Sequence, residues 1–204
     1  MTIKRAFCWL CIIGIMSIAM LSLSSCLFTG RPPLELKGNP IQRAVAGDFR
    51  ATLRFMDDET LNIKYKEQAN PFLTDYYSAQ LKRITVFELT LENESEQAAQ
   101  FFLKRVELDY GGKTLNPTNQ FHLKEYWKFK DSQERTKGIY VSMRENIIDK
   151  NVLRNSYTIG AGAAIRGYLV FMGNTPTYGE AVIFIPVYRT ERERVELFRF
   201  TYEF

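Results

Sequence analysis

Three places in the sequence combine residues that could carry catalytic or metal chemistry. The one histidine, His122, cannot form a metal site or a serine–histidine pair unless Cys, Asp or Glu is arranged around it. We therefore predict a structural role for His122. The acidic run Asp57-Asp58-Glu59 lacks the spaced Asp, Asn and Gly of a calcium loop and is predicted to be a solvated turn. Gly160-Ala161-Gly162 has two glycines of a phosphate loop without the third, which predicts a turn before a strand.

These observations predict a protein that has no metal, no other cofactor and no enzymatic activity. Catalysis by paired carboxylates stays open as an alternative, because distance along the sequence does not determine distance in space. An exported hydrolase is therefore the least favoured functional hypothesis.

The N-terminus carries another kind of reactive pattern, which ends at a cysteine. The cations Lys4-Arg5 precede an apolar run at residues 6–23, and Ser24-Ser25-Cys26 follows it. This order predicts an export signal, because the cations stay in the cytoplasm, the apolar run enters the bilayer and the small residues let a peptidase bind the extended backbone. The alternative is an uncleaved transmembrane helix, since the run approaches the roughly 20 residues that span a bilayer core.

The end of this pattern, Leu23-Ser24-Ser25-Cys26, resembles the lipobox of a bacterial lipoprotein signal. The resemblance implies cleavage between Ser25 and Cys26 and a thioether-linked lipid on Cys26. The mature protein would then hang from a membrane of the bacterial cell envelope by acyl chains. Leu27 is not the aspartate that retains many such proteins in the inner membrane, so the resemblance implies the outer membrane, at its periplasmic or surface face.

The composition of the mature chain fits one exported domain. Removing 25 residues of signal from 204 leaves 179, a length typical of one domain with its own core. The signal takes two of the 27 basic residues, so 25 remain against 23 acidic ones, and a charge of +2 argues against a nucleic-acid partner. Because Cys8 and Cys11 lie in the signal, no cysteine pair remains to form a disulfide, and stability must come from packing.

Residues 26–46 are predicted to be a tether, with the folded domain at residues 47–204. The tether contains Pro32, Pro33 and Pro40, which interrupt both helices and β-ladders. It would hold the domain off the bilayer.

Alternating apolar and polar residues predict a mainly β domain. Residues 49–55 and 61–65 are predicted to pair as a hairpin around the acidic turn. Residues 83–93 are predicted to form the central strand, because their apolar face is the longest and rich in β-branched and aromatic residues. A second hairpin is expected to turn at Gly111-Gly112, which can adopt positive φ.

The last third of the chain is also predicted to be β-structure. Strands at residues 168–171 and 181–186 are predicted to form a hairpin. Residues 195–202 predict a strand that is apolar mostly on its even-numbered face, and the final Phe204 is expected to tie the C-terminus into the sheet.

Helical spacing replaces the strand pattern in the middle of the chain. Residues 118–131 and 141–154 are predicted to be two helices, which together form an insertion at about 118–154. In the first helix, Leu123, Trp127 and Phe129 are expected to be buried against the sheet while the lysines face water. The alternative is a contact surface for lipid headgroups or a partner, made of Tyr126, Trp127, Lys128 and Lys130.

The order of these features resembles the immunoglobulin-like sandwich of DUF4352-like exported bacterial lipoproteins. The resemblance rests on residues 87–93, 101–113 and 160–171, with Gly167-Tyr168-Leu169-Val170-Phe171 the closest piece. It implies an immunoglobulin-like antiparallel β-sandwich with a short helical insertion, and short strands separated by turns favour a sandwich independently.

The favoured functional hypothesis is a non-catalytic interaction module anchored in the cell envelope. Its expected partners are the membrane, through the N-terminal lipid, and an unidentified envelope or extracellular protein. The alternative is a protein that binds a lipid or small apolar ligand between the sheet and the helical insertion.

Overall fold

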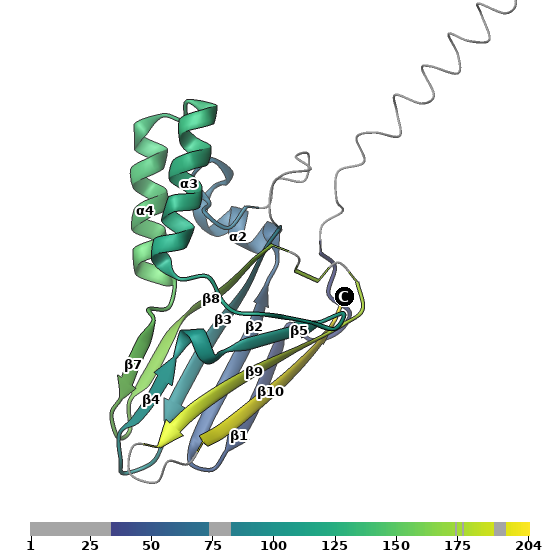
Figure 1. The fold of residues 1–204 in the computed structure, drawn as a ribbon, viewed down its shortest axis with the longest axis vertical. Coiled ribbons are helices and arrows are strands. Elements are labelled where there is room, and N and C mark those ends of the chain that lie inside the picture. The colour runs from purple at the N-terminus through teal and green to yellow at the C-terminus, as the bar shows by residue number, and fades with distance from the viewer. Residues whose placement is uncertain (1–33, 74–82, 174, 177, 190–194) are drawn as a thin grey trace, which may run out of the picture. The chain divides into compact units, whose positions relative to one another are not determined.

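Two antiparallel β-sheets form the framework of the domain (Figure 1). The computed structural model describes residues 34–73, 83–173, 175, 176, 178–189 and 195–204. The first sheet has the order β1-β2-β3-β8, with β1 (Ile41–Ala46), β2 (Phe49–Met56), β3 (Arg83–Asn93) and β8 (Ala164–Gly173). Because β3 pairs with β2 on one side and β8 on the other, its predicted central position is confirmed.

The second sheet is built around one long strand, β9 (Glu180–Arg189). It pairs with β10 (Val195–Glu203) along one edge and with β5 (Glu107–Tyr110) and β4 (Ala99–Phe102) along the other. The outer strands are β6 (Lys113–Leu115), which pairs with β5, and β7 (Ser156–Ile159), which pairs with β4. Gly111 and Gly112 have φ values of 55° and 73°, which confirms the predicted β5–β6 turn.

The main core lies between the two sheets, where alternate residues of both meet. Phe87 of β3 is fully buried, and its ring lies 5.6 Å from Phe55, 6.1 Å from Phe171 and 5.0 Å from Tyr202 of the opposite sheet. Burial of each such ring contributes about 2–3 kcal/mol to the stability of the fold. The even-numbered residues of β10 face this core, as predicted.

Polar groups close the sandwich along the strands β1 and β10. The Gln42 side-chain amide donates to the Thr201 carbonyl and accepts from the Thr201 N–H, as a neighbouring strand would. The Tyr202 hydroxyl donates to the Leu53 carbonyl at 2.8 Å, which satisfies a buried polar group between the sheets. The C-terminus is held by a reciprocal backbone pair between Phe204 and Gly179, which confirms that it is tied into the structure.

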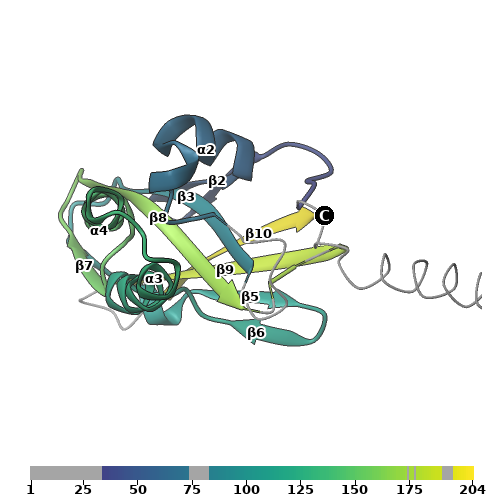
Figure 2. The ribbon, with the colours of Figure 1, turned by 90° about the horizontal axis from the view of Figure 1, so that it is seen from above.

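A second core covers the outer face of β3 and β8. It lies under the helices α2 (Asp58–Tyr65), α3 (Gln120–Glu134) and α4 (Gly138–Asn151). Even positions of β3 and β8, such as Val86 and Val170, pack there against Leu123, Trp127 and Ile148 of the helices. The helices α3 and α4 fall within the predicted insertion at 118–154, and Figure 2 shows them almost end-on beside β8.

A close backbone approach joins the end of α4 to β8. The Leu153 N–H donates to the Tyr168 carbonyl at 3.1 Å, and Val152 forms a parallel bridge with Tyr168. A Cβ atom on Gly167 would lie 2.8 Å from Leu153 Cδ2 and 2.9 Å from the Asn151 carbonyl oxygen. Only glycine fits at this position without displacing the chain.

The predicted strand at residues 61–65 is wrong, because this segment lies in α2. Asp57 caps the helix by accepting a hydrogen bond from the Thr60 N–H at 2.7 Å. Leu61 and Tyr65, four residues apart, face the second core, whereas Ile63 is 78% exposed. The acidic run is therefore a helix start rather than a hairpin turn, and a 3₁₀ turn (Glu67–Ala69) follows the helix.

Two further predictions need correction. The strands at 168–171 and 181–186 do not pair with each other, because β8 belongs to the first sheet and β9 to the second. The tether does not extend to residue 46, because residues 41–46 form β1. Even Lys37 donates its N–H to the Glu203 carbonyl at 2.8 Å. Pro40 is compatible with this arrangement because it precedes the strand.

Candidate functional site

The two predicted signal residues, Ser25 and Cys26, lie outside the described residues, so lipidation stays a prediction. The same holds for the apolar run at residues 6–23. Among the helices that the structure describes, none is long and apolar enough to cross a bilayer.

The predicted contact surface on α3 is divided between the inside and the outside of the domain. Trp127 is only 3% exposed and Lys130 is also buried, whereas Tyr126 is half-buried and Lys128 is exposed. Leu123 and Trp127 are buried as expected, but Phe129 is 66% exposed, so its predicted burial is wrong. The helical period explains the difference, because residues 123, 127, 130 and 131 face inward while residue 129 lies on the opposite side.

Trp127 holds α3 against the rest of the domain. Its indole N–H donates to the Pro71 carbonyl at 2.6 Å. Two cations lie over its ring, with the Lys130 ammonium 4.9 Å and the Arg144 guanidinium 4.3 Å from the ring centroid. Such contacts gain strength when they are shielded from water.

A buried ion pair joins α3 to α4 beside this tryptophan. The Arg144 guanidinium donates to the Asp131 carboxylate through Nη1 and to the Gln68 carbonyl through Nη2, the latter at 2.7 Å. Both side chains are more than nine-tenths buried. A buried ion pair adds little net stability, because the cost of desolvating the two charges offsets much of their attraction. Its main effect is to fix the relative position of the groups that it joins. The pair therefore fixes the orientation of the two helices, which with residues 135–137 we call the helical hairpin.

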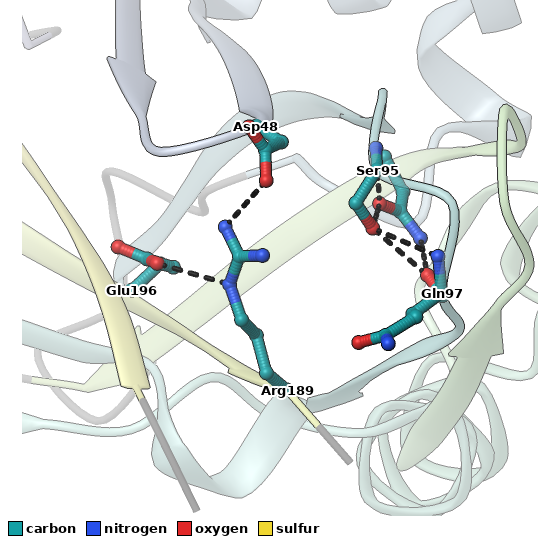
Figure 3. Close-up of polar contacts among 6 residues, drawn as sticks. Asp48, Ser95, Gln97, Arg189 and Glu196 are labelled. Atoms are coloured by element: carbon teal, nitrogen blue, oxygen red, sulfur yellow. Dashed lines mark hydrogen bonds and ion pairs between the residues drawn. The ribbon is translucent and has the colours of Figure 1, made fainter. Parts of the chain in front are cut away.

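The opposite end of the sheets carries a set of tied turns (Figure 1). These are the turns at residues 47–48, 94–98 and 160–163, which we call the loop platform. Arg189, at the end of β9, donates to the Asp48 carboxylate at 2.9 Å and to the Glu196 carboxylate at 3.0 Å (Figure 3). Its guanidinium also lies 5.1 Å from the centroid of the Phe49 ring. The hydrogen bond to Asp48 raises the pKa of Arg189 above its ordinary value, although burial opposes this, so the guanidinium stays charged.

Asn93 ties the other turns of the platform together. Its amide donates to the carbonyls of Gln97, Ile159 and Gly160 at 2.8, 3.0 and 3.0 Å. Its carbonyl oxygen accepts from Ser95, whose hydroxyl also bonds to the Gln97 carbonyl in the turn that Figure 3 shows. Because Asn93 is fully buried, the Asn93-Glu94-Ser95 sequence acts as a turn and not as a glycosylation acceptor in the folded domain.

The remaining candidate residues have structural environments. His122 is exposed in the first turn of α3. Residues 160–163 form the expected turn, with the Ala163 N–H donating to the Gly160 carbonyl at 3.1 Å. Burial raises the pKa of Asp58 from 3.8 to about 6, against the opposing charge of Arg83. In the part of the chain that the structure describes, no cluster of His, Cys, Asp or Glu could hold a metal ion.

Between the first sheet and the helical insertion, where the alternative hypothesis expects a ligand, the described residues form a packed cluster. Leu123, Trp127 and Ile148 belong to one packed cluster with Tyr168 and Val170. The cavity between the facing sides of α3 and α4 holds only about 10 Å³. A cleft of about 160 Å³ at the base of α3 is lined mostly by polar side chains, those of Asn119, Gln120, Arg154 and Asn155 together with Phe121.

Sequence reasoning did not find the residues that organise the loop platform. Arg189 and Asp48 are 141 positions apart, and no local pattern links them. The exposed apolar residues of α4, Ile139 and Met143, were also missed. Their spacing of four residues, on the side opposite Arg144, is a helical signal that could have identified them.

Comparisons with known proteins extend this description only slightly. No known family matches the sequence, and no curated protein matches it. Among solved structures, the yjhA protein from Bacillus subtilis is similar at 13% identity and a TM-score of 0.36, covering 71% of this chain and 76% of its own. Northeast Structural Genomics Consortium target SoR45 is similar at 16% identity and a TM-score of 0.39, covering 78% and 88%. Similarity at this level carries no functional argument.

Proposed function

We propose that this chain is a lipid-anchored, non-catalytic interaction module of the bacterial cell envelope, which presents its loop platform to a protein partner. The observation that carries the proposal is the position of the platform. The chain enters the sheets where Lys37 pairs with Glu203, and β1 then runs away from this point to the platform turn at Asp48. A domain held from its N-terminal side would therefore direct the platform away from the anchor.

The stiffness of the platform supports a role in recognition. The Glu94 N–H donates to the Asp48 carbonyl at 2.8 Å, which adds a backbone link to the Arg189 and Asn93 contacts. Turns that are held by a rigid scaffold lose little conformational entropy when they bind a partner. Exposed polar groups on such turns then supply specificity for the partner.

The anchor is tested by metabolic labelling with a fatty acid. Replacement of Cys26 by Ser is expected to abolish labelling and leave an unprocessed precursor. The matched control is Cys11→Ser, which changes a cysteine of the same segment outside the lipobox and is expected to leave labelling intact. Normal processing and labelling of the Cys26→Ser variant would contradict the proposal.

The location is tested by proteolysis of intact cells and of cells with a permeabilised outer membrane, with a periplasmic protein as control. Digestion of intact cells would indicate a surface-exposed domain. Protection until permeabilisation would indicate a periplasmic domain and an envelope partner. Persistence of the protein in the soluble fraction, with no membrane association, would remove the anchor from the proposal.

The partner is sought by photo-crosslinking in living cells. A photoreactive residue at position 96, in the platform turn, is expected to give a discrete crosslinked product. The matched control is position 107, where Glu107 is exposed on β5 in the middle of the second sheet. Equal products from both positions would show that the platform is not the recognition surface.

We also propose that the sandwich is immunoglobulin-like, as the resemblance of residues 87–93, 101–113 and 160–171 implies. Two antiparallel sheets around one core support this, as do the connections that cross between the sheets from β3 to β4 and from β8 to β9. An experimental structure would test the proposal by whether its strand order superposes on that of an immunoglobulin domain.

A further inference from the structure

The outer side of the helical hairpin carries apolar residues that the domain does not cover. Phe129 of α3 is 66% exposed, and Ile139 and Met143 of α4 are 65% and 38% exposed. All three lie in the half of the hairpin nearest its tip, within six residues of the connection at 135–137. The buried Asp131–Arg144 pair joins the two helices in this half, so the exposed residues sit on a supported frame.

The charges of the tip are mainly basic. Lys128, Arg135 and Lys137 are exposed, and neither Arg135 nor Lys137 forms an ion pair with the described residues. The two acidic residues of the same region are engaged internally, Asp131 by Arg144 and Glu134 by Lys130 at 3.6 Å. The tip therefore combines uncovered apolar side chains with available positive charge, which is the combination that binds anionic lipid surfaces.

The entry point of the chain lies at the same end of the sheets. Lys37 and the C-terminal residues lie at this end, and Figure 1 shows the hairpin extending beyond it. Leu34 already packs against the main core, and it lies eight positions after Cys26. Eight residues span at most about 29 Å when fully extended. The 15 residues of α3 are about 22 Å long.

We propose that the tip of the helical hairpin docks on the surface of the bilayer that holds the anchor. Phe129 and Ile139 enter the interfacial region, while Arg135 and Lys137 contact anionic lipid headgroups. This inference rests on the proposed anchor at Cys26, because the short connection keeps the hairpin within reach of the membrane. The docked hairpin would restrict the domain's rotation and hold the loop platform away from the lipid.

The test uses the full-length protein, purified from membranes and reconstituted into vesicles of phosphatidylglycerol and phosphatidylcholine in equal parts. An environment-sensitive fluorophore is attached at Gln133→Cys near the tip and, in a separate sample, at Glu96→Cys in the loop platform. Brominated phosphatidylcholine then quenches whichever label approaches the bilayer. The Gln133 label is expected to be quenched several-fold more strongly than the Glu96 label.

Two sets of variants assign the quenching to the proposed residues. Phe129→Ser combined with Ile139→Ser is expected to reduce quenching at position 133 to the level at position 96. The matched control is Phe121→Ser, which removes an equally exposed phenylalanine from the opposite end of α3 and should change nothing. Arg135→Gln with Lys137→Gln should reduce quenching in the anionic vesicles but not in pure phosphatidylcholine. Thermal melting of each variant verifies that the fold is retained.

Several outcomes overturn the inference. Equal quenching at positions 133 and 96, or an unchanged signal in the Phe129 and Ile139 variant, excludes docking by the tip. If the label at position 133 is protected from water but not quenched by the lipid, and this protection depends on the protein-to-lipid ratio, a second copy of the chain covers this surface instead. Mass spectrometry of the same sample reports the lipid on Cys26, so loss of the anchor and loss of docking are distinguished.

Discussion

The loop platform and the helical hairpin lie at opposite ends of the sheets and are stabilised by different means. At the platform, polar side chains such as Arg189 and Asn93 join the turns to one another by hydrogen bonds. At the hairpin, Trp127 and Leu123 bury apolar surface against the first sheet, and the buried Asp131–Arg144 ion pair joins the two helices. The platform is therefore held by directional bonds, whereas the hairpin depends mainly on packing.

The two ends also differ in the kind of side chain that they expose to water. At the platform, Arg189 and Asn93 form hydrogen bonds with neighbouring turns, and the side chains left exposed include polar ones such as Glu94 and Glu96. The hairpin uses one side of each helix for packing and leaves Phe129 and Ile139 in water. Exposed apolar groups on a supported element indicate contact with another surface more strongly than scattered ones do.

The largest effect is expected where the hairpin packs on the sheet. Trp127→Ala removes a buried ring and its hydrogen bond to Pro71, and should lower the free energy of unfolding by about 3–5 kcal/mol. Phe129→Ala, two residues away on the outer side of the same helix, should change it by no more than about 0.5 kcal/mol. Urea unfolding of both variants measures the contrast. Similar losses would mean that the hairpin has no distinct inner and outer side.

The second prediction concerns the ion pair between the helices. Asp131→Ala leaves the buried Arg144 guanidinium without its carboxylate and should cost about 3 kcal/mol. Replacing both residues, as Asp131→Leu with Arg144→Met, should recover much of this loss, because no buried charge remains. A double variant that is less stable than Asp131→Ala would show that the pair itself stabilises the hairpin.

The third prediction moves to the platform, where a smaller loss is expected. Arg189→Gln removes the guanidinium from the buried Glu196 carboxylate and should cost about 1–3 kcal/mol. The matched control is Arg50→Gln, whose ion pair with Glu94 is exposed on both sides and should be worth less than about 1 kcal/mol. Equal losses in the two variants, measured by denaturant unfolding, would contradict the view that Arg189 organises this end.

These contrasts also indicate which parts of the fold could be predicted from the sequence. The strand at residues 83–93 and the two helices of the insertion were predictable because long periodic patterns specify one kind of element. Residues 61–65 are too few for their pattern to distinguish a strand from a helix. Leu61, Ile63 and Tyr65 alternate as in a strand, but the Asp57 cap starts a helix that includes them. The predicted pairing of residues 168–171 with β9 is wrong for a different reason. Strand pairing depends on which sheet each strand joins, and a local pattern does not determine this.

The candidate site shows the same limit more strongly. The burial of Trp127 followed from its spacing with Leu123, but the exposure of Phe129 depended on which side of α3 meets the sheet. The contacts of Arg189 with Asp48 and of Asn93 with Ile159 join residues far apart in the chain. Such tertiary contacts have no signature in local composition, so the platform could only be recognised in three dimensions.

The smallest expected effect depends on pH and lies beside the hairpin, in α2. Burial raises the pKa of Asp58 to about 6, so the folded state holds a proton that the unfolded state releases near pH 3.8. The stability from this proton is therefore complete below about pH 4 and is lost as the pH rises through about 6. Asp58→Asn keeps the group neutral, and at pH 7 it should raise the free energy of unfolding by about 1 kcal/mol, since partial exposure weakens the full effect.

Unfolding measurements between pH 4 and pH 7 distinguish this effect from a simple loss of contacts. The stability difference between Asp58→Asn and the native chain should be close to zero at the acid end and grow toward neutral pH. Phe129→Ala, which removes no titratable group, should show no such trend. A pH-independent difference for Asp58→Asn would mean that Asp58 does not titrate between pH 4 and pH 7 in the folded chain.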